Sequence, residues 1–159
     1  MKKIFLSSLF LLLFLSLTAC GNTKENIETN TAAKEKTSKI LIAYFSRTGN
    51  TKEIALKIQE KTNGELFEIQ PAEPYPENYK ETTDKAKQEL SSGYLPPLKT
   101  KINNLESYDI IFIGYPIWWG TIPGPVRTFL TENDFSGKII IPFCTHGGSG
   151  IASSTSDIQ

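Results

Sequence analysis

Apolar and polar blocks alternate along the chain from Lys39 onward. Long apolar runs rich in β-branched and aromatic residues predict strands buried on both faces, as in a parallel sheet. Polar stretches with apolar residues at helical spacing predict helices between these strands. The expected strands are 39–46, 65–70, 108–115 and 138–143, and the expected helices are 50–62, 79–92, 125–131 and a last one from 150 to the chain end. This alternation predicts an α/β fold built on a parallel sheet.

The same spacing predicts which helical residues face the sheet. In the first helix these are Ile54, Ala55 and Ile58, and in the third they are Val126, Phe129 and Leu130. Three prolines within 71–78 predict a loop before the second helix, because proline interrupts regular structure.

The N-terminus has the pattern of an exported lipoprotein. Lys2 and Lys3 precede an apolar run over 4–17, which is shorter than the roughly 20 residues of a membrane-spanning helix. The residues that follow, Leu17-Thr18-Ala19-Cys20, resemble a bacterial lipobox, in which the cysteine is lipidated and becomes the new N-terminus. The alternative is a buried helix that ends by chance in a cysteine.

We therefore expect a signal peptide over 1–19 and a flexible tether over 20–38 that begins at lipidated Cys20. Residues 21–38 are mostly Asn, Thr, Lys, Glu and Ala, which bury too little apolar surface to fold. The resemblance implies a lipoprotein anchored to the extracytoplasmic face of a bacterial membrane.

Composition narrows the chemistry. Lys and Arg number 17, as do Asp and Glu, so no basic excess points to a nucleic-acid partner. Two Cys and one His leave no thiolate zinc site and no histidine-rich metal centre.

Three loops of unusual composition follow predicted strands, over 46–51, 115–122 and 144–150. In open parallel sheets, ligands bind outside the carboxyl ends of the strands. We therefore look for the function in these loops.

The first loop, Ser46-Arg47-Thr48-Gly49-Asn50-Thr51, places hydroxyl groups and a glycine at the start of a helix. Free backbone N–H groups at a helix N-terminus attract anions, although an ordinary helix cap is the alternative. The run resembles the flavodoxin phosphate loop, Ser/Thr-x-Thr-Gly-x-Thr. The resemblance implies that this loop holds the phosphate of flavin mononucleotide (FMN), with Arg47 either pointing to solvent or helping to neutralise the phosphate.

The second loop contains Pro116, Ile117, Trp118, Trp119 and Gly120. Aromatic side chains at a strand end suit a flat isoalloxazine ring. We expect one of the two Trp side chains to cover the following helix instead. The run resembles the flavin loop of a flavodoxin-like branch that includes bacterial lipoproteins, and Gly120 is a candidate hinge.

The third loop begins at Cys144, which we expect to end a buried strand and do not propose as a nucleophile. Glycines allow the backbone to approach a ligand closely. The resemblance implies that this loop borders the pyrimidine side of the flavin, although many flavodoxins carry an aromatic residue here and this loop offers only His146, for which plain loop polarity is the alternative. Its expected cofactor-binding residues are Thr145, His146, Gly147, Gly148, Ser149 and Gly150.

The resemblance covers residues 39–159 and implies a doubly wound flavodoxin-like sheet with strand order 2-1-3-4-5. The fifth strand and last helix are missing from the pattern, so strand 138–143 should form an exposed apolar edge. We expect a truncated domain, or a second chain that covers this edge.

The leading functional expectation is an FMN-binding electron carrier with an unidentified protein or small-molecule redox partner and no catalytic side chain. One alternative is an FMN-dependent NAD(P)H or quinone reductase. Another is a non-enzymatic lipoprotein with a vestigial flavin site.

Overall fold

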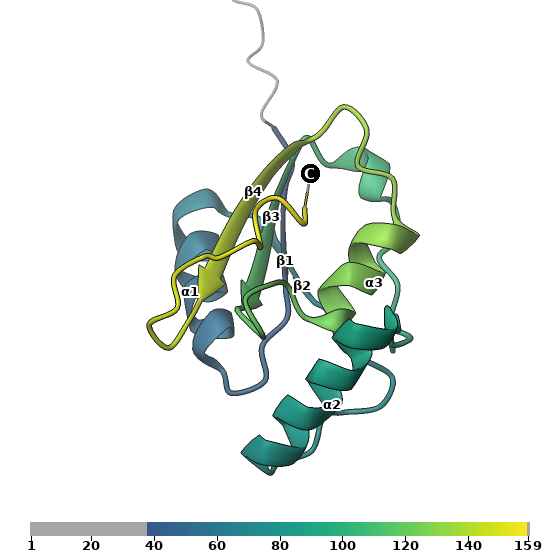
Figure 1. The fold of residues 1–159 in the computed structure, drawn as a ribbon. Helices are drawn as coiled ribbons and strands as arrows, with labels where there is room; N and C mark the ends of the chain where they lie inside the picture. Colours follow the sequence, from purple (N-terminus) through teal and green to yellow (C-terminus); the bar gives the residue numbers. More distant parts are fainter. Residues whose placement is uncertain (1–37, 159) are drawn as a thin grey trace, which may run out of the picture. The chain divides into compact units, whose positions relative to one another are not determined.

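The computed structural model describes residues 38–158, and its centre is a four-stranded parallel sheet (Figure 1). The strands are β1 (Ile40–Tyr44), β2 (Glu65–Glu68), β3 (Ile110–Pro116) and β4 (Ile139–Thr145). Their spatial order is β2-β1-β3-β4, which confirms the predicted order for these four strands. Residues 38–158 contain no fifth strand. The predicted signal peptide, Cys20 and nearly all of the tether lie outside the described residues.

The central strands are buried on both faces, as their apolar runs predict. Leu41 and Ala43 of β1 contribute to one apolar cluster, while Ile42 and Tyr44 contribute to the other. Alternate residues of a strand point to opposite faces, so the two clusters are the two sides of the sheet. Every residue of 41–44 is at most 3% exposed.

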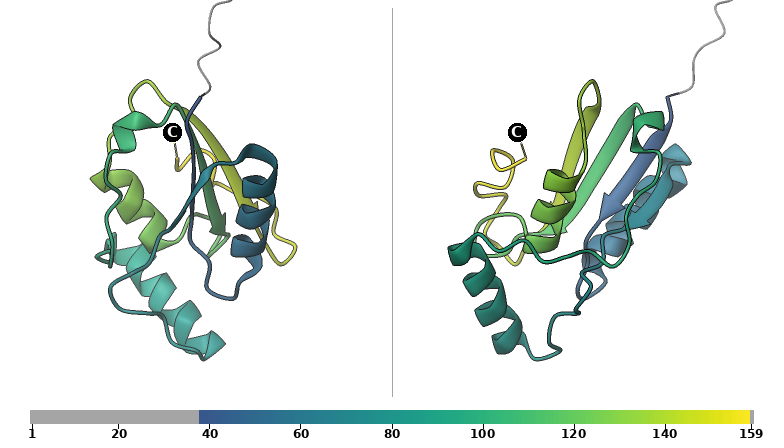
Figure 2. Two further views of the ribbon diagram at one scale, coloured as in Figure 1. Left: turned by 180° about the vertical axis from the view of Figure 1, so that it is seen from behind. Right: turned by 90° about the vertical axis from the view of Figure 1, so that its right-hand side faces the viewer.

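Helices cover the two faces of the sheet (Figure 2). Helix α1 (Asn50–Thr62) packs on one face, and α2 (Tyr79–Ser92) and α3 (Gly124–Glu132) lie on the other. A short 3₁₀ helix, Leu105–Ser107, precedes β3. Val126 and Phe129 of α3 are buried and Leu130 is partly buried beside them, as predicted.

The predicted inner face of α1 is only partly correct. Ala55 is fully buried and Ile58 packs beside it, but Ile54 is 38% exposed. Thr51 is buried instead, so the stripe that meets the sheet runs through positions i, i+4 and i+7 from Thr51. Ile54 lies on the flank of this stripe.

The expected last helix does not form within residues 150–158, of which 152–158 make consecutive turns. Serine hydroxyls in this segment bind nearby carbonyls: Ser154 Oγ donates to Ile151 O over 2.6 Å, and Ser156 Oγ to Ser153 O over 2.7 Å. Such bonds compete with helical ones. Ser154 is fully buried and lies 3.2 Å from the hydroxyl of Tyr115, so the segment packs against β3.

Strand β4 is an edge of the described sheet, and its Ile139 and Ile141 are 59% and 37% exposed. The expectation of an exposed apolar edge is confirmed for this sheet. Among the described residues, no helix has the length and apolar character needed to cross a bilayer.

Candidate functional site

The first loop connects β1 to α1 and leaves the start of the helix open. Gly49 caps α1 with φ +91°, and no side chain caps the free N–H groups there. A left-handed φ favours glycine, and a Cβ at this position would meet no atom within 4 Å. The tight turn and the uncapped helix end together form a place where an anion can approach the backbone.

Ser46 lies in the same loop, close to the end of β1. Its Oγ is buried and has no hydrogen-bond partner among the described residues. A buried hydroxyl without a partner is costly, and an anionic oxygen would satisfy it. Because this orphaned donor lies beside an uncapped helix N-terminus, the residues present fit a phosphate group.

The Arg47 side chain contacts the loop that leads into α2. Its Nη2 donates to the carbonyl oxygens of Pro76 and Glu77, over 3.1 and 2.5 Å. The guanidinium thereby holds the loop that leads into α2, while Arg47 also lines the cavity described below, so its part in neutralising a phosphate stays a prediction. Sequence patterns do not indicate this contact, because its partners are 29 and 30 residues apart.

The second loop turns sharply between Trp118 and Thr121. Their backbone groups bond in both directions, Trp118 N to Thr121 O over 3.0 Å and Thr121 N to Trp118 O over 3.1 Å. The two central residues, Trp119 and Gly120, have φ of +52° and +76°. Two consecutive positive φ values are typical of a type I′ turn, and they are strained for a side chain as large as Trp119.

The two Trp side chains take different directions, as expected. The Trp118 ring packs edge-on against Phe45 and Tyr75, with centroid distances of 5.3 and 4.9 Å. Trp119 is 52% exposed, and its Nε1 donates to the carbonyl of Thr83 in α2 over 3.0 Å. Trp119 therefore contacts α2, which precedes it in sequence, and both Trp residues also line a small pocket together with Gly124 and Arg127 of α3.

The third loop is organised by His146. Its Nδ1 accepts hydrogen bonds from the backbone N–H groups of Gly148 and Gly150, over 3.1 and 3.2 Å. These contacts give His146 a structural task within the loop. Cys144 is half-buried at the end of β4, and burial raises the pKa of its thiol, which disfavours the nucleophilic thiolate.

The three loops meet around a cavity of about 270 Å³. Most of the predicted residues line it: Ser46, Arg47, Thr48, Asn50, Thr51, Pro116, Ile117, Trp118, Thr145, His146 and Gly147. The remaining predicted residues do not line this cavity: Gly49, Trp119, Gly120, Gly148, Ser149 and Gly150. The assignment of all of them to a cofactor stays a prediction.

Sequence reasoning missed Tyr79, which also lines this cavity. Tyr79 opens α2 and is 76% exposed. A second cavity, of about 370 Å³, lies next to the first and shares Arg47, Tyr79, Ile117 and Trp118 with it. The sequence offers one indication that Tyr79 is part of the site: it is an aromatic residue at the start of a polar helix, after a proline-rich loop.

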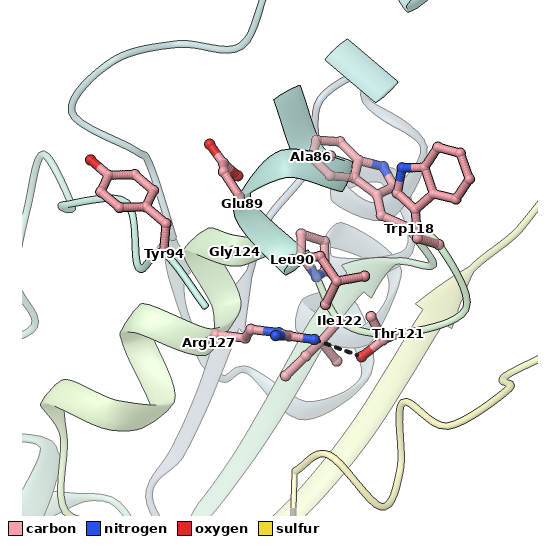
Figure 3. Close-up of a pocket in the computed structure, with 11 residues that line it drawn as sticks. Ala86, Glu89, Leu90, Tyr94, Trp118, Thr121, Ile122, Gly124 and Arg127 are labelled. Carbon is pink, nitrogen blue, oxygen red and sulfur yellow. Dashed lines mark hydrogen bonds between the residues drawn. The ribbon is translucent and has the colours of Figure 1, made fainter. Parts of the chain in front are cut away.

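A buried carboxylate of α2 lines a small pocket together with Trp118 and Thr121 of the second loop (Figure 3). Glu89 of α2 is 6% exposed, and its Oε2 accepts a hydrogen bond from the Tyr75 hydroxyl over 2.5 Å. Burial and this carboxylate raise the pKa of Tyr75. Oε1 of Glu89 has no partner among the described residues, and a space of about 10 Å³ beside it is close to the size of one water.

The comparisons with known proteins agree with this geometry. The family model for flavodoxin matches residues 39–159. No curated protein matches the chain. Solved structures do, and three of them bear on the site.

Two are crystal structures of candidate flavoproteins from Bacteroides species. The protein from Bacteroides eggerthii is 39% identical over 75% of this chain and 77% of its own, with a TM-score of 0.70. The protein from Bacteroides uniformis is 39% identical over 77% of this chain and 81% of its own, with a TM-score of 0.71.

The third is a flavoprotein from Lactobacillus acidophilus in complex with FMN. It is 28% identical over 76% of this chain and 83% of its own, with a TM-score of 0.69. The family model spans most of the chain, and the strand order β2-β1-β3-β4 is that of a flavodoxin-like sheet. The chain therefore belongs to the flavodoxin family.

Proposed function

We propose that this protein binds FMN where its three loops meet and carries electrons at a membrane surface, to which lipidated Cys20 anchors it. Membership of the flavodoxin family and the FMN complex of the Lactobacillus acidophilus flavoprotein support the choice of cofactor. FMN supplies one- and two-electron redox chemistry when it is bound. The protein's part is to bind and orient the cofactor and to limit its contact with water.

The buried Ser46 hydroxyl carries this proposal. Ser46 Oγ lacks a partner among the described residues and lies beside the uncapped N-terminus of α1. In our proposal it donates to a phosphate oxygen, together with backbone N–H groups after Gly49. This set of donors suits a terminal phosphate monoester, because the Gly-Lys-Ser/Thr ending of a nucleoside triphosphate loop is absent from the sequence.

In our proposal the second and third loops hold the isoalloxazine ring of FMN. The Trp118 loop supplies aromatic and apolar area, and the Thr145–Gly150 loop supplies backbone groups that the contacts of His146 hold in place. We assign no side chain a proton-transfer or nucleophilic role.

A titration of full-length protein, purified in detergent and freed of flavin, tests cofactor binding. Quenching of flavin fluorescence should report tight binding of FMN and much weaker binding of riboflavin, which lacks the phosphate. Ser46→Ala should weaken FMN binding by roughly ten-fold and leave riboflavin binding unchanged. Ser91→Ala, on the exposed side of α2, is the matched control. A folded protein that binds neither flavin would favour a vestigial site.

Membrane anchoring needs its own experiment, because Cys20 lies outside the described residues. We expect the wild-type protein to sediment with bacterial membranes and to incorporate labelled fatty acid. Cys20→Ser should do neither. Equal labelling of both proteins would rule out lipidation at Cys20.

A small-molecule reductase is a second candidate function. The 370 Å³ cavity beside the proposed flavin site is lined partly by aromatic rings and falls in the size range of small-molecule pockets. Steady-state oxidation of NAD(P)H by the FMN-loaded protein, with and without a quinone, separates a reductase from a carrier. The carrier should show no sustained turnover.

A further inference from the structure

Tyr79 is an exposed aromatic residue at a position where nothing in the fold needs one. It is the first residue of α2 and is 76% exposed. Among the described residues, its hydroxyl makes no hydrogen bond. Leaving a large ring in water has a cost in free energy that a bound flat molecule would recover.

The position of Tyr79 connects the two cavities. It lines the cavity that is bordered by the phosphate loop, and it also lines the neighbouring cavity beside Trp119. Ile117 and Trp118 line both cavities as well. A flat ligand that reaches from the phosphate loop toward Trp118 therefore passes within the space that Tyr79 borders.

The start of α2 is held firmly, so Tyr79 is presented in a defined place. Asn78 Oδ1 accepts from the backbone N–H of Glu81 over 3.1 Å, which caps the helix. Thr82 Oγ1 donates to Pro76 O over 2.6 Å, and Arg47 Nη2 donates to the same carbonyl over 3.1 Å. Arg47 belongs to the phosphate loop. Hydrogen bonds to Pro76 O therefore connect both this loop and the first turn of α2, which carries Tyr79, to the loop before α2.

The third loop carries no Phe, Tyr or Trp that could stack on a flavin ring. Its only ring is His146, and the Nδ1 atom of that ring accepts from two backbone N–H groups of the loop. We infer that Tyr79, supplied by α2, is the aromatic side chain that packs against the isoalloxazine ring. This inference rests on the proposed function and adds a ring contact from outside the three loops.

The test compares two ligands on four proteins. FMN and riboflavin are titrated into wild-type protein, Tyr79→Leu, Tyr79→Phe and Tyr94→Leu, all full-length and in detergent. Tyr94 is the matched control, because it is 53% exposed near α2 but does not line the cavity of the phosphate loop. Urea unfolding of each flavin-free variant shows that it is folded.

Tyr79→Leu should weaken the binding of both flavins by the same factor, roughly 5- to 30-fold, because the two ligands share the ring. It should also leave the bound flavin more fluorescent. Tyr79→Phe and Tyr94→Leu should stay within about two-fold of wild type.

The outcomes separate the two proposals. A loss for FMN alone, or equal effects of Tyr79→Leu and Tyr94→Leu, would overturn the role of Tyr79 and leave FMN binding standing. A folded wild-type protein that binds neither flavin would overturn both proposals.

Discussion

The hydroxyl oxygens of Thr51 and Thr145 lie 2.9 Å apart, and this hydrogen bond joins the first turn of α1 to the carboxyl end of β4. Thr51 is only 1% exposed. The contact connects the first loop to the third across the end of the sheet, although 94 residues separate them in sequence. This hydrogen bond therefore helps to set the spacing of the first and third loops around the cavity.

Thr51→Val should remove this bond while keeping the shape of the side chain. It leaves the Thr145 hydroxyl without its partner, so we expect a loss of about 1–2 kcal/mol in the free energy of unfolding. Urea unfolding of the flavin-free protein measures this. Thr131→Val is the matched control, because Thr131 is exposed on α3 and bonds only to the carbonyl of Arg127. Equal effects of the two substitutions would show that the Thr51–Thr145 contact adds no stability.

Gly49→Ala should destabilise the protein through strain in the backbone. The φ of +91° disfavours any L side chain, while the surrounding space is open, so the expected cost is about 1–2 kcal/mol. Gly147→Ala is the control, because a Cβ there also meets nothing within 4 Å and its φ lies outside the positive range. Thermal unfolding of both variants should separate the effect of the positive φ from the effect of adding a methyl group in open space. A Gly147→Ala variant as unstable as Gly49→Ala would contradict this explanation.

The sequence predicted most of what depends on local pattern. The apolar runs located β1 and β3 because both faces of these strands are buried, and that burial leaves few polar positions. The order of the strands came from the motif resemblance, since periodicity alone does not say which strands are neighbours. The loops at the strand ends could be named because glycines and hydroxyl residues gather there.

Contacts between distant segments could not be predicted. Tyr79 lines the cavity, and Arg47 bonds to the loop before α2, although about 30 residues separate the two side chains in sequence and the local pattern of neither indicates these contacts. Ile54 fits a helical stripe, but the sheet meets the stripe of Thr51 and Ala55 instead. The segment 150–158 has helical composition in part, yet its serine hydroxyls bind local carbonyls and favour turns.

Gly114→Ala should be among the most damaging small substitutions in the sheet. Gly114 of β3 is opposite Phe143 of β4, and a Cβ on Gly114 would lie 2.2 Å from the Phe143 ring. The ring must move for the strands to stay paired, so we expect a cost of at least about 2 kcal/mol.

A double-mutant cycle tests this cause. If the clash is with the ring, Phe143→Leu should relieve part of the cost, and the double variant should be more stable than the sum of the two single effects predicts. Additive losses, measured by urea unfolding, would place the cause elsewhere in the sheet.

Alkaline pH should weaken the fold through Tyr108. This side chain is 4% exposed, and its hydroxyl donates to Glu65 Oε2 over 2.5 Å. Burial first, and then the hydrogen bond to Glu65, raise the pKa of Tyr108 from 10.0 to about 12. In the unfolded chain the pKa returns to its ordinary value, so the unfolded state loses this proton first as the pH rises.

The contribution of Tyr108 to stability is therefore complete below pH 10 and decreases between about pH 10 and 12. Urea midpoints at pH 8, 10 and 11 for wild type and Tyr108→Phe measure it. The comparison is needed because other groups also titrate in this range. Phenylalanine has no proton to lose, so the stability advantage of wild type over Tyr108→Phe should be constant from pH 8 to about 9.5 and then decrease. An advantage that stays constant to pH 11 would mean that Tyr108 ionises equally readily in both states.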